Sequence, residues 1–381
     1  MSTRVIGIAL VMAVLLVVLS TGNVHAQTKN PVRAGLITEH TGAASMGGER
    51  AIRGAKLAEK QVNAGGGING TPISVVIYDN NSTTQGTVNA VNKAIDDKVI
   101  AILGPGRSTH DQAVSPIIKE NAIPALIGGT AVQLTNHGNP WFFRVRPDDS
   151  IYGSAIAEFL IKDLRLTKIG ILHDMDAFGT GGADIVIETL KKNNIVPVRR
   201  ERYSVGTKDY TAQLLNMKNA GAEGVALYTT NSEDAAVVFR QIRELGISWK
   251  IVGCPASASQ VVVELAKDAS EGAYAAVDYF AEANPQAKAF RDAYFKEYNQ
   301  EPDFFSYTYD AVSLFSNVMK RAGATADRNK LRETILATKG YQGIMGTYNF
   351  TPNGDGIHEI NLVQMKGQKL QYIRTINVGP Q

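Results

Sequence analysis

Two hydroxyl-bearing turns are the segments of this sequence best suited to binding an anion. The first is Gly104-Pro105-Gly106, which follows the apolar run Val99–Leu103 and leads into Ser108 at the start of a predicted helix. Backbone N–H groups at a helix start lack intrahelical partners and carry the positive end of the helix dipole. Ser is also a common N-cap. The turn therefore predicts either a capped helix or a ligand site.

The next predicted strand, Ala125–Ile127, ends in the same way. It is followed by Gly128-Gly129-Thr130. Ligands of open α/β sheets bind beyond the carboxyl ends of the strands, so two adjacent strands that finish in Gly with Ser or Thr favour a polar binding floor. Arg107 directly precedes Ser108, and it either adds positive charge near a bound carboxylate or points into solvent.

Nucleotide-binding and catalytic motifs are missing. Thr109 stands where the dinucleotide fingerprint needs its third glycine, and no Lys completes a phosphate loop. The glycine-rich run Gly65–Gly70 precedes a strand, which makes it a turn. The sequence has no G-x-S-x-G or H-E-x-x-H motif, and its histidines lack ligand spacing. We therefore expect no catalytic residue, no metal and no cofactor.

Composition indicates a globular protein with room for two domains. The chain has 381 residues, of which 44% are hydrophobic and 20% charged, and its net charge is +3. Basic and acidic residues are interleaved, without the basic patch that nucleic-acid binding requires. The single cysteine, Cys254, excludes an internal disulfide and is typical of a buried small hydrophobe.

The N-terminus predicts a secretory signal peptide over residues 1–26. Arg4 is followed by the apolar run Val5–Leu19, and Val24-His25-Ala26 fits the small-residue cleavage pattern, with cleavage after Ala26. A membrane anchor is the alternative, but a span needs about 20 apolar residues and this run is shorter. We expect a periplasmic protein.

Predicted strands and helices alternate along the rest of the chain. The first run comprises strands 32–38, 73–78, 99–103 and 125–127 with helices 50–63, 84–96 and 109–121. The second comprises helices 150–163, 181–193, 210–220 and 232–245 with strands 168–173, 196–203, 224–229 and 250–253. This rhythm predicts two doubly wound α/β units with parallel sheets. A tail of helices 290–298 and 307–322 and strands 346–350, 360–365 and 370–375 would return to both units and create a hinge.

Seven stretches in order carry a resemblance to a known family. They are residues 54–80, 99–109, 127–135, 142–153, 168–181, 240–246 and 271–279. Together they resemble the periplasmic solute-binding proteins of branched-chain amino acid ABC transporters, the type I periplasmic binding proteins. The resemblance implies two lobes joined by three hinge strands that close on a solute. The lobes would be residues 27–148 with about 279–350, and 149–278 with about 351–381.

The resemblance also implies residue roles. Ser108 would hold a solute carboxylate, Thr130 and the backbone at Gly128 would contact the same head group, and Asp149 lies at the first hinge. The family's aromatic positions fall at Phe178, near Asn231 and near Met46. The expected ligand-binding residues are Met46, Arg107, Ser108, Gly128, Thr130, Asp149, Tyr152, Phe178 and Asn231.

One part of the family pattern is absent. The Glu that binds the solute ammonium would fall at Pro255 or Ala256, where there is no acid. A buried ammonium without a counter-charge costs several kcal/mol. Either another acid, such as Asp149 or Glu233, replaces it, or the solute is an aromatic or keto acid without an ammonium. We expect a monomeric import component that delivers its solute to an inner-membrane permease; a periplasmic ligand sensor is the alternative.

Overall fold

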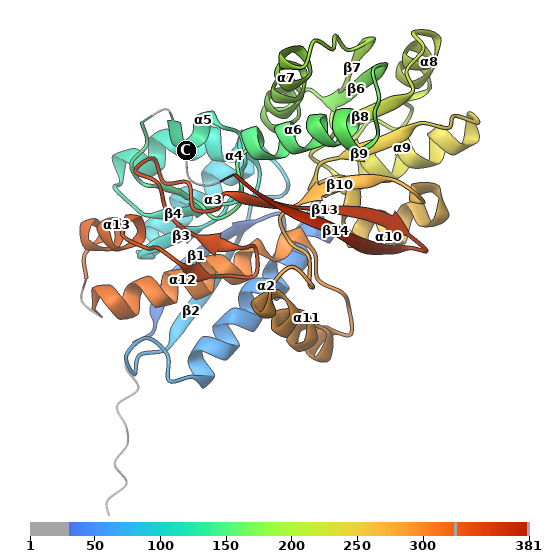
Figure 1. Ribbon diagram of the computed structural model, residues 1–381. Coiled ribbons are helices and arrows are strands. Elements are labelled where there is room, and N and C mark those ends of the chain that lie inside the picture. Colours follow the sequence, from blue (N-terminus) through green and yellow to red (C-terminus); the bar gives the residue numbers. More distant parts are fainter. Residues whose placement is uncertain (1–29, 137, 324–325, 379–381) are drawn as a thin grey trace, which may run out of the picture. The chain divides into compact units, whose positions relative to one another are not determined.

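Figure 1 shows the computed structural model of the chain. The structure describes residues 30–136, 138–323 and 326–378. The predicted signal peptide and its cleavage after Ala26 lie outside these residues. Among the helices that are described, none is long and apolar enough to cross a membrane.

The first sheet has five parallel strands in the order β2-β1-β3-β4-β5. They are β1 (Val32–Thr38), β2 (Ile73–Asp79), β3 (Ala101–Leu103), β4 (Ala125–Ile127) and β5 (Phe142–Arg144). β3 and β4 are neighbours, so the two hydroxyl-bearing turns that follow them lie at one edge of the sheet. β1 pairs with β3 on its other side, which brings the residues after Thr38 to the same edge.

Helices connect these strands. They are α2 (Ser45–Ala64), α3 (Thr84–Asp96), α4 (Ser108–Glu120) and α5 (Gln133–Asn136). Each of the longer three buries one side, as apolar residues that recur every three or four positions predict. The Thr83 hydroxyl accepts the N–H of Gly86 and so caps α3.

The second sheet has seven strands in the order β14-β13-β10-β9-β8-β6-β7. They are β6 (Ile169–Asp174), β7 (Arg199–Tyr203), β8 (Gly224–Tyr228), β9 (Lys250–Gly253), β10 (Tyr274–Val277), β13 (Glu359–Lys366) and β14 (Lys369–Asn377). β6 to β10 pair in parallel, whereas the hairpin β13–β14 adds antiparallel to β10. The C-terminal strands therefore extend the second sheet.

The second sheet carries its own helices, and residues 149–277 with β13 and β14 are called the second-sheet side below. The helices are α6 (Asp149–Glu158), α7 (Ala177–Lys192), α8 (Thr211–Asn219), α9 (Ser232–Glu244) and α10 (Gln260–Ala266). α6 continues into a π-helical turn over Phe159–Asp163, where the sequence predicts one helix from 150 to 163. A short 3-10 helix, Pro255–Ala258, follows β9.

The segment from Pro285 onward returns to the first sheet before the final hairpin. It forms α11 (Pro285–Tyr298), α12 (Tyr307–Ala322), α13 (Arg328–Leu336) and the small hairpin β11 (Tyr341–Gln342) and β12 (Thr347–Tyr348). Figure 1 shows α12 beside α2, and the Thr308 hydroxyl donates to the Ala51 carbonyl. The predicted fold class, α/β with two largely parallel sheets, is confirmed; the lobe boundaries stay a prediction.

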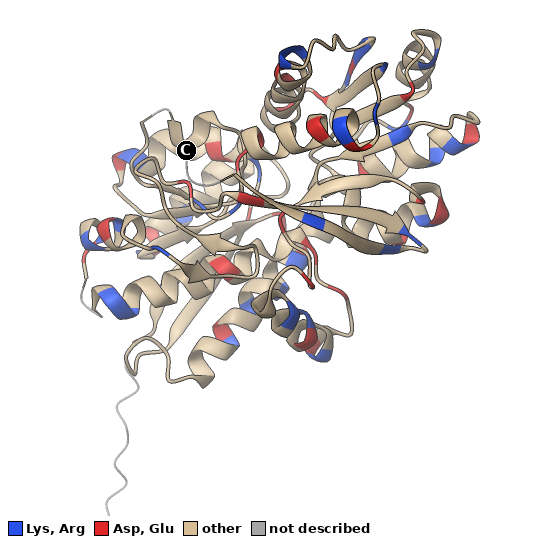
Figure 2. Cartoon of the chain, in the orientation of Figure 1, with Lys and Arg blue, Asp and Glu red and all other residues tan. Residues whose placement is uncertain are grey.

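Charged side chains are distributed over the outer helices. Figure 2 shows Lys and Arg interspersed with Asp and Glu along them. Several pairs lie one helical turn apart, such as Lys93 with Asp97 and Lys192 with Glu188. Exposed pairs of this kind contribute only about 0.3–0.5 kcal/mol each.

Candidate functional site

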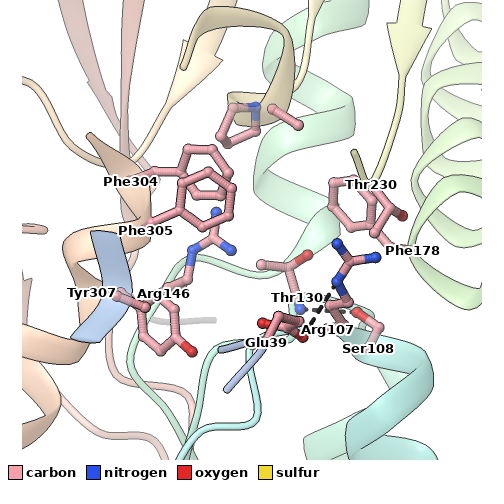
Figure 3. Close-up of a pocket in the computed structure, with 14 residues that line it drawn as sticks. Glu39, Arg107, Ser108, Thr130, Arg146, Phe178, Thr230, Phe304, Phe305 and Tyr307 are labelled. Carbon is pink, nitrogen blue, oxygen red and sulfur yellow. Dashed lines mark hydrogen bonds and ion pairs between the residues drawn. The ribbon is translucent and has the colours of Figure 1, made fainter. Parts of the chain in front are cut away.

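A cavity of about 580 Å³, counting the space that opens to solvent, lies between the first sheet's edge and the second-sheet side. Figure 3 shows its principal side chains. Its lining residues are Glu39, Ala51, Gly106, Arg107, Ser108, Thr130, Arg146, Phe178, Thr230, Pro255, Ala256, Phe304, Phe305 and Tyr307.

Ser108 is the first residue of α4, and its hydroxyl does not cap that helix. Its Oγ instead accepts the backbone N–H groups of Thr130 and Ala131 at 3.1 and 3.0 Å. A hydroxyl has two acceptor sites and one proton to donate. Both acceptor sites are used within the chain, so Ser108 has an O–H donor left for a ligand in the cavity.

Thr130 offers the opposite capacity. Its hydroxyl donates to Asp149 Oδ1 at 2.8 Å, and the same oxygen accepts from the Tyr228 hydroxyl at 2.8 Å. The Thr130 oxygen therefore keeps acceptor capacity on its cavity side. Burial raises the pKa of Asp149 to about 7 although these two hydrogen bonds lower it. Ser108 and Thr130 thus place a donor beside an acceptor.

Arg107 and Glu39 form an ion pair on the cavity wall. Arg107 Nε lies 3.3 Å from Glu39 Oε1, and Arg107 Nη2 donates to Asn231 Oδ1 at 2.7 Å. Burial would raise the pKa of Glu39, but the hydrogen bond with His110 and the charge of Arg107 lower it to about 2. Glu39 is therefore a carboxylate at neutral pH. The first-sheet edge thus supplies both a cation and an anion.

Glu39 reaches the cavity because it directly follows β1. Helix α2 packs closely against the backbone of Glu39. A Cβ on Gly48 would lie 1.9 Å from the Glu39 carbonyl oxygen, so only glycine permits this approach. Asn80, which follows β2, lies 3.4 Å from Glu39 Oε1. The acid is therefore fixed by two neighbouring strand ends.

Arg146 carries the second guanidinium of the wall and, unlike Arg107, is buried. Its Nε donates to Asp278 Oδ2 at 2.5 Å, and its Nη1 donates to the Gly128 carbonyl at 3.2 Å. The guanidinium lies 4.9 Å from the ring centre of Phe304 and 5.9 Å from that of Tyr307. The Phe304 and Tyr307 rings therefore pack against the Arg146 guanidinium, whose charge is balanced by Asp278.

The cavity has two unlike ends. In Figure 3, Glu39, Arg107 and Ser108 lie together at one end, and Phe304 and Phe305 lie toward the other. The Phe304 and Phe305 rings are 4.1 Å apart. A ligand of matching polarity has a charged head and an apolar body.

A sequence model of the periplasmic binding protein family matches residues 31–369.

This chain belongs to the periplasmic binding protein family.

Individual relatives agree with this assignment. The leucine-, isoleucine-, valine-, threonine- and alanine-binding protein of Pseudomonas aeruginosa is 28% identical over 87% of this chain and 88% of its own length. The crystal structure of the branched-chain amino acid transporter substrate binding protein LivJ from Streptococcus pneumoniae, in complex with isoleucine, has a TM-score of 0.84 at 25% identity, covering 92% of this chain and 100% of the other. A solute binding protein of an ABC transporter from Rhodopseudomonas palustris, in complex with 3,4-dihydroxybenzoic acid, shares the fold at 21% identity and a TM-score of 0.84, covering 91% of this chain and 97% of the other.

Family membership fixes the general class of the protein. It is a substrate-binding protein and not an enzyme, and the family is periplasmic. The resemblance drawn from the sequence is therefore confirmed. Which solute this periplasmic binding protein takes depends on its own cavity.

The structure brings four of the predicted ligand-binding residues onto the cavity wall. They are Arg107, Ser108, Thr130 and Phe178. Phe178 lies in the first turn of α7, and its ring centre is 4.8 Å from that of Tyr228. The wall therefore combines residues from both sheets.

The other predicted residues lie behind the wall or beside it. Asp149 and Tyr152 are fully buried, the first under Thr130 and the second against Arg146. Asn231 holds Arg107, and Met46 on α2 is 36% exposed. The Gly128 N–H donates to the Pro105 carbonyl, and its own carbonyl accepts from Arg146. Glu233, suggested as a replacement acid, is absent from the residues that line the cavity.

Sequence reasoning missed Glu39 and the aromatic wall. Glu39 could have been found by the rule that identified Ser108 and Thr130, because it too is a polar residue directly after a strand. Arg146 and the cluster Phe304–Tyr307 had no comparable signal. Arg146 follows β5, a strand that the sequence did not predict, and the cluster enters the cavity from a segment that is distant in sequence.

Proposed function

We propose that this periplasmic binding protein captures an α-amino acid with an apolar side chain and delivers it to a membrane permease of an ABC importer. The observation that carries the proposal is the charge pair at one end of the cavity. Arg107 and Glu39 lie beside the Ser108 donor and the Thr130 acceptor. An α-amino acid carries its two opposite charges on one carbon, so both can be met at this end.

The solute carboxylate is assigned to Ser108 and Arg107. The Ser108 O–H has no acceptor among the residues that the structure describes. Within the same residues, Arg107 uses Nε in its ion pair with Glu39 and Nη2 in its hydrogen bond to Asn231. Arg107 Nη1 is therefore available as a second donor. Hydrogen bonds to a charged group stabilise by about 1.5–3 kcal/mol each.

The solute ammonium is assigned to Glu39 and Thr130. Within the described chain, the polar contacts of the Glu39 side chain all go to Oε1, from Arg107, His110 and Asn80. Oε2 is therefore free to accept from an ammonium. The Thr130 oxygen supplies a neutral acceptor. Glu39 then binds the solute ammonium in place of the acid that is missing at Pro255 and Ala256.

The apolar side chain is assigned to the opposite end. Phe304 and Phe305 lie there, and Pro255 and Ala256 belong to the same wall. Burying a Leu- or Phe-sized side chain against such surface contributes about 1.5–3 kcal/mol. The relative from Pseudomonas aeruginosa and the isoleucine complex support the same solute class.

An organic acid without an ammonium is the second candidate. It is favoured by the Arg107–Glu39 contact itself, because this ion pair already neutralises Glu39. The neighbour that holds 3,4-dihydroxybenzoic acid belongs to the same fold. The two candidates make opposite demands on Glu39.

Glu39→Gln separates them. If the solute carries an ammonium, the variant loses a charged acceptor and amino acids bind at least tenfold more weakly, since removing one partner of a charged hydrogen bond costs about 2–5 kcal/mol. If the solute is a plain carboxylate, the variant frees Arg107 and binding strengthens. Calorimetric titration with valine, leucine, phenylalanine, benzoate and 4-methyl-2-oxopentanoate measures the sign. Glu49→Gln, which removes an exposed acid paired with Arg53 on α2, is the matched control.

Transport is tested separately from binding. Deletion of the ABC permease that serves this binding protein should abolish uptake of the solute identified by calorimetry. Unchanged uptake would favour a periplasmic sensor. We expect the binding protein to act as a monomer, which sedimentation of the mature chain checks.

A further inference from the structure

A second cavity lies behind the apolar end of the first. It has a volume of about 1060 Å³, counting the space that opens to solvent. Its apolar walls come from β10 and the residues after it, from the loop before α12 and from the β13–β14 turn. The chief apolar contributors are Val277, Tyr279, Phe280, Pro302 and Leu370.

Phe304 and Pro255 line both cavities. Phe304 projects from the segment that precedes α12, and Pro255 begins the 3-10 helix after β9. The remainder of that 3-10 helix is Ala256, Ser257 and Ala258, whose side chains are small. The two cavities therefore share a wall that consists of Phe304, Pro255 and small residues, and rotation of the Phe304 ring is the movement that would join them.

The apolar end of the first cavity lies at this shared wall. Its charged end holds Glu39 and Ser108, whereas Phe304 and Phe305 lie toward the far end (Figure 3). A solute whose head group binds at Glu39 and Ser108 therefore extends its side chain toward Phe304. A longer side chain would extend past Phe304 toward the second cavity.

We propose that the second cavity is a second chamber of the solute site, which receives the distal part of a long apolar or aromatic side chain. This inference rests on the proposed function and deepens it. The solute class is then α-amino acids whose side chains extend beyond that of leucine, with an aryl or long alkyl end.

The chemistry of the second chamber fits an uncharged end. The guanidinium of Arg291, which lines this chamber, donates hydrogen bonds to both carboxylate oxygens of Glu301, at 2.9 and 2.5 Å. Asp303 accepts the N–H groups of Phe305 and Gln260 and lies 3.9 Å from Arg50. The Phe280 ring is stacked on Tyr372 with centres 5.6 Å apart. These three charged groups are satisfied within the chain, and the other two charged residues of the lining, Glu282 and Lys369, are exposed to solvent. The aromatic surface is left for an apolar group.

The test fills the second chamber and compares two solutes with the same head group. Ala281→Phe and Leu370→Trp enlarge residues that line the second cavity and not the first. Ala220→Phe adds the same ring at an exposed position that lines neither cavity, and is the matched control. Valine and homophenylalanine are titrated against each variant by calorimetry.

For the unaltered protein we expect binding of both solutes. Ala281→Phe and Leu370→Trp should each weaken homophenylalanine binding at least tenfold and leave valine binding within twofold, and Ala220→Phe should change neither. An unchanged ratio of the two affinities in both filling variants, or valine binding without homophenylalanine binding, overturns the second chamber and leaves the head-group site standing. Failure of the unaltered protein to bind any amino acid refutes the proposed function itself.

Discussion

Replacing Asp149 by Asn should make the stability of the protein less dependent on pH. Asp149 is fully buried, and its Oδ1 accepts from Thr130 and Tyr228 while its Oδ2 has no partner among the described residues. Burial raises its pKa from 3.8 to about 7. The folded protein therefore binds this proton more tightly than the unfolded chain does.

The sign and size of the effect follow from that difference. An acid with a raised pKa gives its full contribution to stability below about pH 4, where both states are protonated, and loses it as the pH rises to about 7. The pKa differs by about three units between the folded and unfolded states. At about 1.4 kcal/mol per unit, the free energy of unfolding falls by about 4 kcal/mol. Asn has nearly the shape of the protonated acid and does not titrate.

Urea unfolding of the mature chain at pH 4, 5, 6, 7 and 8 measures this. The free energy of unfolding of the wild type, minus that of Asp149→Asn, should fall by about 4 kcal/mol between pH 4 and pH 8. Other buried acids cancel in the difference. Asp184→Asn, which changes an exposed acid paired with Arg200, should give a flat difference. A flat difference for Asp149→Asn as well would mean that Asp149 is ionised without cost, and would refute the account of its burial.

Three further predictions concern the site and the core. Ser108→Ala combined with Thr130→Ala should weaken solute binding at least tenfold in calorimetry; wild-type affinity would place the head group elsewhere. Arg144 is fully buried, binds Asp355 at 2.7 Å and donates to the carbonyls of Gly129 and Ala131, so Arg144→Met should lower the free energy of unfolding by about 3 kcal/mol or more and also weaken solute binding, and an unchanged urea midpoint would contradict this. Burial raises the pKa of Cys254 to about 12, so a thiol reagent at pH 8 should label the unfolded chain and spare the native one; rapid native labelling would show that Cys254 is accessible.

The sequence predicts best those elements whose boundaries are set locally. Ala125–Ile127 and Lys250–Gly253 have the predicted bounds, because buried apolar runs end there at turn residues. β5 and β10 were not predicted. They are three and four residues long, and their extended conformation comes from pairing with β4, β9 and β13, which no local pattern records. The direction in which β13 joins the second sheet is likewise a property of the tertiary structure.

The residues of the candidate site also fall into two groups, those that a local pattern reveals and those that only tertiary packing brings together. Ser108 and Thr130 are found from the sequence because a strand end, a glycine turn and a hydroxyl are adjacent in the chain. Phe304 and Tyr307 meet Arg146 only after a segment far along the chain returns to the first sheet. Their spacing alone indicates a helix face in a core, and the packing of Phe304 and Tyr307 around the cavity adds the second role.

The position of Glu39 explains why the second-sheet side of this cavity needs no acid. The residues of that side on the cavity wall are Phe178, Thr230, Pro255 and Ala256, and none of them is charged. Under the proposed function, both charges of the solute head are met at the edge of the first sheet. The second-sheet wall then contributes shape, apolar contact and exclusion of water, which strengthens the polar contacts that are already formed. Substitutions at Pro255 or Ala256 should consequently alter which side chain is accepted, whereas substitutions at Glu39 should alter whether an amino acid is accepted at all.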